Sequence, residues 1–191
     1  MKILIATHNV GKKKEIQQIL GNAVEVLNLD DITVSVPEPE ETGSTYEENA
    51  LIKARHAGDL SGLLTIADDS WLEVEALPGE LGVKTARYGS GNDADRYTKL
   101  LQAMHGIAQR KAKFVSCIVL YDPKDKTSHT FFGEMPGSIA HEARGTNGFG
   151  YDPVFIPEGY QQTFAELGTE IKNTISHRAK AVEKLKKFMV K

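Results

Sequence analysis

Two spacings of apolar residues alternate along the chain, and together they predict an α/β protein. Short apolar runs predict buried strands, and apolar residues three or four apart predict helices that cover those strands. Strands are expected over residues 2–6, 24–29, 63–67, 113–121, 128–134, 138–143 and 153–156. Helices are expected over residues 11–20, 44–60, 94–104, 163–174 and the segment that follows Ser176. The α/β ends and β-rich middle predict an α/β core that carries a second small lobe.

Composition narrows the class of protein. The 191 residues contain 23 Lys and Arg against 26 Asp and Glu, a net charge of −3. A general nucleic-acid-binding protein usually has a basic excess, so no nucleic-acid partner is expected. The single cysteine, Cys117, excludes an intrachain disulfide and fits a reducing, cytoplasmic compartment. No apolar run approaches the roughly 18 residues that a membrane span needs, so no membrane association is expected.

The turn after the first expected strand carries polar and cationic residues and opens into a helix. Such a turn is where α/β sheets bind ligands, and a helix N-terminus attracts phosphate. The same pattern also fits a plain polar turn with solvated lysines, because it does not match the P-loop motif. The turn residues are Thr7, His8, Asn9, Val10, Gly11 and Lys12.

Carboxylates gather at the ends of other expected elements. Glu41 lies in a loop, and the pair Asp68-Asp69 follows a short buried strand. Oxygen ligands of this kind suit Mg²⁺, and a second carboxylate beside the metal can activate water. Asp69 is expected at the same sheet edge as the Thr7 turn, although adjacent aspartates also fit a helix cap or a turn. In the helix over residues 44–60, Lys53 shares a face with Asn49 and His56, which either presents it to phosphate or is a solvated stripe.

A glycine-rich segment over residues 145–153 surrounds one aromatic side chain, Phe149. Flanking glycines let a flat ligand approach, so Phe149 is a candidate to stack on a nucleobase and Asp152 to accept a hydrogen bond from it. Lys172, His177 and Arg178 cluster around the start of the last helix, and their donors suit carbonyl oxygens on a base edge. The glycine-rich segment also fits a tight turn with a purely structural role, and the cluster at the last helix also fits a helix cap.

Taken together, these motifs and their order resemble the inosine triphosphate pyrophosphatase family, also described as Ham1-like or non-canonical purine NTP pyrophosphatases. Any one motif is modest, whereas seven in the right order are highly specific, and they cover residues 2–185. The seven are Thr7-His8-Asn9-Val10-Gly11-Lys12 with Glu15; Glu41-Thr42-Gly43 with Glu48-Asn49-Ala50 and Lys53-Ala54; Ala67-Asp68-Asp69-Ser70; Ala86-Arg87-Tyr88; Gly148-Phe149-Gly150-Tyr151-Asp152-Pro153; Lys172; and Ser176-His177-Arg178.

The resemblance implies a fold and an activity. The fold would be a single domain over residues 1–191, with an elongated mixed-sheet α/β core and a second smaller lobe around a central cleft (ITPase-like, also called Maf/Ham1-like). The activity would be hydrolysis of ITP, dITP and XTP to the monophosphate and pyrophosphate with Mg²⁺, by a cytoplasmic homodimer.

The resemblance also implies residue roles. The residues from Thr7 to Lys12, with Lys53, would hold the triphosphate. Glu41 and Asp69 would bind the metal, and Asp69 would also be the general base for water. Phe149 would stack on the purine, whose edge would be read by Asp152, Lys172, His177 and Arg178. Ser70, Gly150 and Tyr151 complete the expected substrate-binding set.

The chain departs from the family pattern after the aspartate pair. Trp71 stands where the family has glycine, and Leu81-Gly82-Val83-Lys84 replaces a more usual proline-glycine followed by an aromatic residue. If the glycine serves a positive φ or close ligand approach, Trp71 would impair the site; if the indole points into an apolar pocket, the site stays open. Two alternatives therefore remain: a pyrophosphatase for other modified NTPs, such as damaged pyrimidine triphosphates, or a nucleotide-binding protein without turnover.

Overall fold

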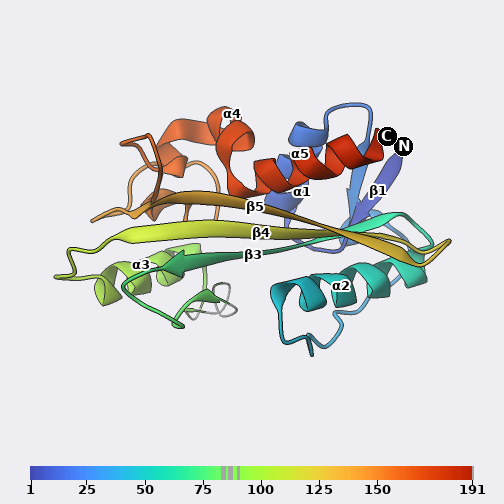
Figure 1. Cartoon of the computed structure of the whole chain (residues 1–191), viewed down its shortest axis with the longest axis horizontal. Helices are drawn as coiled ribbons and strands as arrows, with labels where there is room; N and C mark the ends of the chain where they lie inside the picture. Colours follow the sequence, from blue (N-terminus) through green and yellow to red (C-terminus); the bar gives the residue numbers. More distant parts are fainter. Residues whose placement is uncertain (83–84, 86–87, 90, 191) are drawn as a thin grey trace. The chain divides into compact units, whose positions relative to one another are not determined.

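The computed structural model describes residues 1–82, 85, 88–89 and 91–190. It has an α/β architecture with one mixed six-stranded sheet in the order β2-β1-β3-β4-β5-β6 (Figure 1). Strands β1 and β2 pair in parallel, as do β1 and β3, whereas β5 and β6 pair antiparallel. The α/β class with a mixed sheet, expected from the sequence, is confirmed.

The chain forms two compact units. Unit 1 comprises Met1–Ser70, Ser116–Gly133 and Arg178–Lys191, and unit 2 comprises Trp71–Val115 and Glu134–His177. The strands are β1 (Lys2–Ile5), β2 (Glu25–Asn28), β3 (Thr65–Val74), β4 (Lys111–Asp122), β5 (Thr127–Ile139) and β6 (Phe155–Pro157). The helices are α1 (Val10–Leu20), α2 (Tyr46–Ser61), α3 (Asp93–Ala103), α4 (Phe164–Ile175) and α5 (His177–Met189), with short 3-10 turns at Leu29–Asp31 and Asp152–Val154. No helix within these described ranges is both long and apolar enough to span a membrane.

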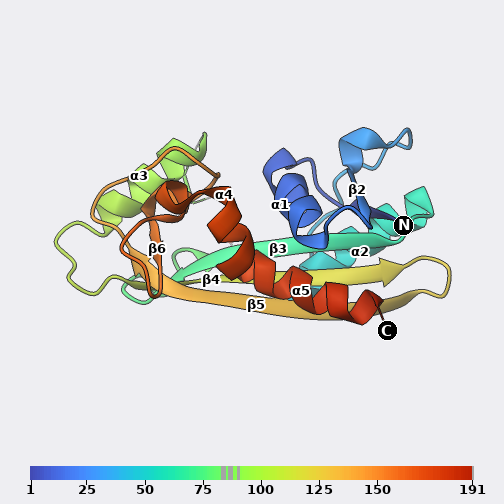
Figure 2. The same ribbon diagram turned by 90° about the horizontal axis from the view of Figure 1, so that it is seen from above.

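In unit 1, helices cover both faces of the sheet. Helices α1 and α5 bury an apolar cluster against Ile118 and Leu120 of β4, whereas α2 lies on the opposite face (Figures 1 and 2). Helix α2 approaches closely because Gly58 faces the Tyr121 ring, where an added Cβ would lie 2.7 Å from Cδ1. Thr45 caps α2, and its hydroxyl accepts the Glu48 N–H at 3.1 Å.

Unit 2 has its own aromatic core. Phe114 of β4 lies 4.5 Å from Phe155 of β6 between ring centroids, and Phe164 of α4 joins them. Leu100 of α3 is fully buried in the same cluster. Figure 2 shows α3, α4 and β6 gathered around the parts of the long strands that belong to this unit. This core supports the glycine-rich segment that carries Phe149.

Two strand predictions were wrong. The run over 63–67 overlaps only the first three residues of β3, which has 10 residues. The expected strands over 128–134 and 138–143 are replaced by one strand, β5, which ends at Ile139. The two expected strands left a gap over residues 135–137, but Pro136 and Gly137 both fit β5 beside β6. The Pro136 carbonyl accepts the Glu158 N–H at 2.9 Å, and Gly137 leaves room for the Ile156 carbonyl, which a Cβ would strike.

Candidate active site

The Thr7 turn has the strand–turn–helix geometry expected from the sequence. Strand β1 ends at Ile5, and Asn9 caps α1 by accepting the Lys12 backbone N–H at 3.0 Å. The Thr7 hydroxyl accepts the Asn9 N–H at 3.1 Å, and His8 Nδ1 lies 2.7 Å from Asp30 Oδ1. The turn is therefore an ordered helix N-terminus, the kind of site that attracts anions.

The aspartate pair lies beside this turn. In the parallel pairing of β1 with β3, Ile5 aligns with Ile66, so β3 continues where β1 stops. The Lys12 ammonium reaches across and donates to the Asp68 carbonyl at 2.8 Å, and lies 3.1 Å from Asp68 Oδ2. The expected grouping is present, with one correction: Asp69 lies inside β3, not beyond its end.

Lys53 joins two of the expected carboxylates. Its Nζ lies 3.3 Å from Asp69 Oδ1 and 3.4 Å from Glu41 Oε1. The Lys53 side chain is only 19% exposed, so this face of α2 is not simply a solvated stripe. The neighbouring Asn49 has a structural role, because its Oδ1 accepts the Gly43 N–H at 2.8 Å.

The pKa values of the two adjacent aspartates are shifted in opposite directions. Burial raises the pKa of Asp69, an effect that Lys53 and Lys12 only partly oppose. Burial would also raise the pKa of Asp68, but Arg178, Lys12 and two serine hydroxyls hold it well below its ordinary value. Asp68 is therefore a fixed anion, and Asp69 is the better proton acceptor of the two. Such a separation is typical of carboxylates with different catalytic roles.

A buried ion-pair network encloses Asp68. Arg178 Nε and Nη2 donate to Asp68 Oδ2 at 3.0 and 2.9 Å, and Nη1 donates to Glu15 Oε2 at 2.5 Å. The Ser116 hydroxyl donates to Asp68 Oδ1 at 2.6 Å, and the Ser70 hydroxyl does so at 2.7 Å. The Arg178 side chain is 2% exposed. This placement favours a role in holding Asp68 over the expected role at a purine edge, which stays a prediction.

The network includes two residues to which the sequence analysis gave no role. Ser116 is a polar residue inside the apolar run of β4, and Glu15 lies beside Ile16 on the buried face of α1. A buried polar side chain needs a partner, so both positions carried a recognisable signal. The sequence showed the need for partners but did not identify Arg178 as the residue that binds Glu15.

In unit 2, the glycine-rich loop brings three expected residues together. Asp152 Oδ2 accepts the Phe149 N–H at 2.9 Å and lies 2.5 Å from Lys172 Nζ. The Lys172 ammonium lies 4.5 Å from the centroid of the Phe149 ring, a cation–π contact. Gly148 has φ +81°, and a Cβ there would strike the Asp152 carboxylate, so only glycine fits. The loop therefore presents an aromatic ring with a buried cation beside it.

Two other expected substrate-binding residues are packed inside unit 2. The His177 ring stacks on Phe114, with centroids 4.6 Å apart and planes 12° from parallel. The Tyr151 hydroxyl donates to the Thr85 carbonyl at 2.8 Å, and burial raises the pKa of this phenol. Both side chains support the loop, and direct contact with a substrate stays a prediction. Val83 and Lys84, and Ala86 and Arg87 of the Ala86-Arg87-Tyr88 motif, lie outside the described residues.

Trp71 does not have the strained backbone that a replaced glycine suggested. It lies within β3, and Lys126 is the one non-glycine residue with positive φ in the described ranges. The side chain is 7% exposed, and its Nε1 donates to Glu73 Oε1 at 2.7 Å. The positive-φ interpretation was wrong because extended backbone accepts any side chain. This removes the backbone argument for a protein without turnover.

We therefore expect Trp71→Gly to destabilise the protein without raising kcat/KM. Loss of the buried indole and a glycine within a strand would together cost about 4–6 kcal/mol of unfolding free energy. Urea unfolding and steady-state kinetics measure the two effects. A tenfold gain in kcat/KM in the folded variant would show that the indole obstructs the site.

The residues present fit a metal that arrives with a phosphorylated substrate. Within the described part of the chain, no group of three or more His, Cys, Asp or Glu side chains is placed to hold a metal ion. Glu41 and Asp69 nevertheless both reach the Lys53 ammonium. Mg²⁺ commonly takes one or two carboxylates together with substrate phosphates, and this pair of oxygen ligands meets that need.

Comparisons with known proteins place the whole chain in one family. The Ham1 family model matches residues 3–188. A dITP/XTP pyrophosphatase from Haemophilus influenzae is 50% identical to this chain over 191 residues, and the alignment covers 97% of each chain. A dITP/XTP pyrophosphatase from Porphyromonas gingivalis is 47% identical over 192 residues, and the alignment covers 99% of this chain and 97% of that one. The solved structure of a HAM1 protein from Coxiella burnetii matches with a TM-score of 0.86 and 40% identity, covering 100% of this chain and 98% of that one. The chain belongs to the Ham1 family.

Proposed function

We propose that this protein hydrolyses dITP, XTP and ITP to the nucleoside monophosphate and pyrophosphate. Its relatives named dITP/XTP pyrophosphatase support this activity along nearly the whole chain. The observation that carries the proposal is the placement of Asp69, a carboxylate of raised pKa, against Lys53 and Glu41. Proton acceptor, cation and second carboxylate are the groups that phosphoanhydride hydrolysis needs.

The triphosphate would bind to unit 1 at the Thr7 turn. The first backbone N–H groups of a helix lack intrahelical partners and carry partial positive charge. Lys12, which pairs with Asp68, and Lys53, which pairs with Asp69, would neutralise the negative charge of the phosphate oxygens. The ion pair between Asp68 and Lys12 would keep this ammonium in place before the substrate arrives.

Mg²⁺ is the proposed metal, with Glu41 and Asp69 as its ligands. Bound with the triphosphate, it would neutralise charge on the phosphate oxygens. Lys53 lies within 3.4 Å of both carboxylates, so it keeps the two oxygens near one another and limits their repulsion.

Asp69 would accept the proton of the attacking water. The water oxygen forms a bond to the α-phosphorus while the bond from that phosphorus to the α–β bridging oxygen breaks, and pyrophosphate leaves. Asp69 lies against the Lys53 ammonium, which would hold its carboxylate in place for this proton transfer. The fixed anion Asp68 would take no proton and would hold Lys12 and Arg178.

The purine would be recognised by unit 2. Phe149 would stack on the base, and Lys172 and Asp152 would meet its polar edge. Hypoxanthine and xanthine carry a carbonyl at position 6, whereas adenine carries an amino group. An ammonium donor aimed at that position would be left unpaired by ATP, at a cost of about 1–3 kcal/mol for each lost hydrogen bond. Roles for His177 and Arg178 at this edge, the two-lobed single domain and the homodimer stay predictions.

The proposal is tested by pyrophosphate release from dITP, XTP, ITP, ATP and GTP, each with and without Mg²⁺. We expect turnover of the first three with Mg²⁺, at least about tenfold lower kcat/KM for ATP, and little turnover after chelation. Faster release from a modified pyrimidine triphosphate would favour the alternative substrate class. Binding of dITP without any release would contradict the proposed activity.

A further inference from the structure

Two carboxylates hold the backbone on both sides of the Phe149 Cα. The Phe149 N–H donates to Asp152 Oδ2 at 2.9 Å, and the next N–H along the chain, that of Gly150, donates to Asp93 Oδ2 at 2.6 Å. Asp152 belongs to the same loop, whereas Asp93 is the first residue of α3. These two bonds fix the peptide groups that set the direction of the Phe149 side chain.

Asp93 is itself held in place. Its Oδ1 pairs with Arg96 Nη2, and Arg96 Nη1 donates to the Gly91 carbonyl at 3.2 Å. The start of α3 is capped by Asn92, whose side chain accepts the Asp95 N–H at 3.1 Å. The carboxylate that binds Gly150 is therefore anchored to an ordered helix and not to a second loop.

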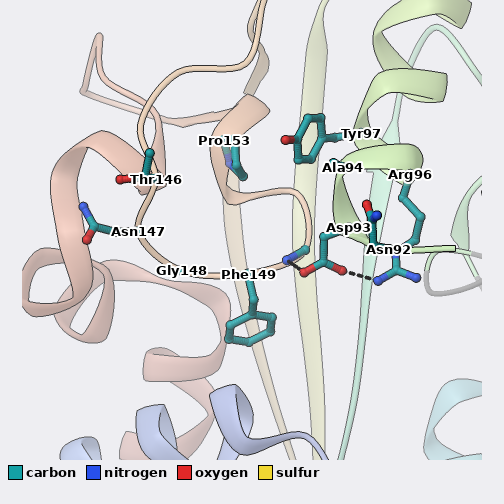
Figure 3. Close-up of a pocket in the computed structure, with 11 residues that line it drawn as sticks. Asn92, Asp93, Ala94, Arg96, Tyr97, Thr146, Asn147, Gly148, Phe149 and Pro153 are labelled. Atoms are coloured by element: carbon teal, nitrogen blue, oxygen red, sulfur yellow. Dashed lines mark hydrogen bonds and ion pairs between the residues drawn. The ribbon is translucent and has the colours of Figure 1, made fainter.

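Helix α3 and the loop form opposite sides of one pocket within unit 2. The pocket has a volume of about 520 Å³. Its lining from α3 and the cap is Asn92, Asp93, Ala94, Arg96 and Tyr97, and the loop contributes Phe149 and its neighbours. Figure 3 shows the Asp93 carboxylate between the loop and Arg96, with the Phe149 ring pointing away from α3. The bond from Gly150 to Asp93 joins the two sides of the pocket.

We propose that Asp93 is a positioning residue that orients Phe149 for stacking on the purine. This proposal rests on the proposed function, because only a purine nucleotide substrate would supply the base on which the Phe149 ring stacks. Gly150 has φ +64°, and a glycine explores many backbone conformations unless a bond restrains it. Without the Asp93 carboxylate, the loop would have to be ordered each time a nucleotide binds, and that entropy cost would weaken binding. The chemistry at Asp69 would be unchanged once the nucleotide is bound.

The test compares Asp93→Ala, Asp93→Asn and the matched control Asp95→Ala. Asp95 belongs to the cap of the same helix, where its Oδ2 accepts the Asn92 N–H at 3.0 Å. We expect Asp93→Ala to raise the KM for dITP by about tenfold, the typical loss for a hydrogen bond to a charged group, with kcat within about threefold. Asp93→Asn retains one oxygen acceptor for the Gly150 N–H but loses the oxygen that pairs with Arg96, so it should recover only part of the affinity. Asp95→Ala should lower Tm and leave KM unchanged.

Hydrogen exchange of the Gly150 amide measures the hydrogen bond from Gly150 to Asp93 directly, without any need for turnover. Faster exchange in Asp93→Ala, together with weaker IMP binding by calorimetry, supports the proposal. Unchanged exchange would overturn it, as would faster exchange with unchanged KM and IMP affinity. A fall in kcat with constant KM would also overturn it. If the wild-type protein releases no pyrophosphate from dITP, the proposed function fails, whereas exchange and IMP binding still decide the role of Asp93.

Discussion

Replacement of Asp69 by asparagine is expected to lower kcat for dITP by about a hundred- to ten-thousandfold, the usual contribution of a general base. The amide has nearly the shape of the carboxylate but cannot accept the proton of water. Lys12 and the helix N-terminus remain, so nucleotide binding should be retained. Single-turnover pyrophosphate release measures the chemical step, and calorimetric titration with dITP measures binding.

The control is Asp59→Asn on α2, within the same unit. Asp59 Oδ1 accepts the Tyr121 hydroxyl at 2.7 Å, and an amide oxygen can accept the same bond. Its kcat should stay within about twofold of the wild-type value, because Asp59 has no role in proton transfer. Near-normal turnover by Asp69→Asn would contradict the assignment of the base.

Loss of Arg178 should destabilise the fold more than it changes base choice. Arg178→Ala would remove the guanidinium that binds both buried carboxylates, Asp68 and Glu15, and would leave Asp68 paired with Lys12, at a cost of about 3–5 kcal/mol of unfolding free energy. For a chain of this length that corresponds to a fall in Tm of roughly 6–20 °C. The ratio of kcat/KM for ITP to that for ATP should not change, because the loss of Arg178 would weaken the binding site equally for both substrates.

Arg178→Lys keeps the assay possible if the alanine variant does not fold, since it retains a positive charge but loses the forked donor. Arg55→Ala on the exposed surface of α2 is the control and should leave Tm nearly unchanged. A falling ITP/ATP ratio with an unchanged Tm would show that Arg178 reads the purine edge, as the sequence alone suggested.

Local patterns predicted most elements of the fold. The helices expected over 11–20, 44–60 and 94–104 from apolar spacing are present as α1, α2 and α3, with ends shifted by no more than two residues. The length of β3 could not be predicted in this way. Its apolar run stops at Asp68 because the strand passes there through a polar cluster, so hydrophobicity ends while the hydrogen-bonded ladder continues.

The candidate site was predictable as a set of residues but not as a set of partners. The placement of Asp69 beside the Thr7 turn was expected from the order of strands, whereas the grouping of Glu41 and Lys53 with Asp69 was implied by the family resemblance alone. The bond between Arg178 and Glu15 joins residues 163 positions apart, and charge patterns alone do not select such a pair. At Trp71 the sequence suggested a feature that is absent: the missing glycine pointed to a strained backbone, but the residue lies in a strand with ordinary extended backbone.

The most direct test of the proposed chemistry is product identification by phosphorus NMR, with dITP and Mg²⁺ as the starting mixture. The wild-type protein should convert dITP to dIMP and pyrophosphate in equal amounts, and Asp69→Asn should leave dITP intact over the same period. Formation of dIDP and orthophosphate would place the attack at the γ-phosphorus and would contradict the proposed mechanism.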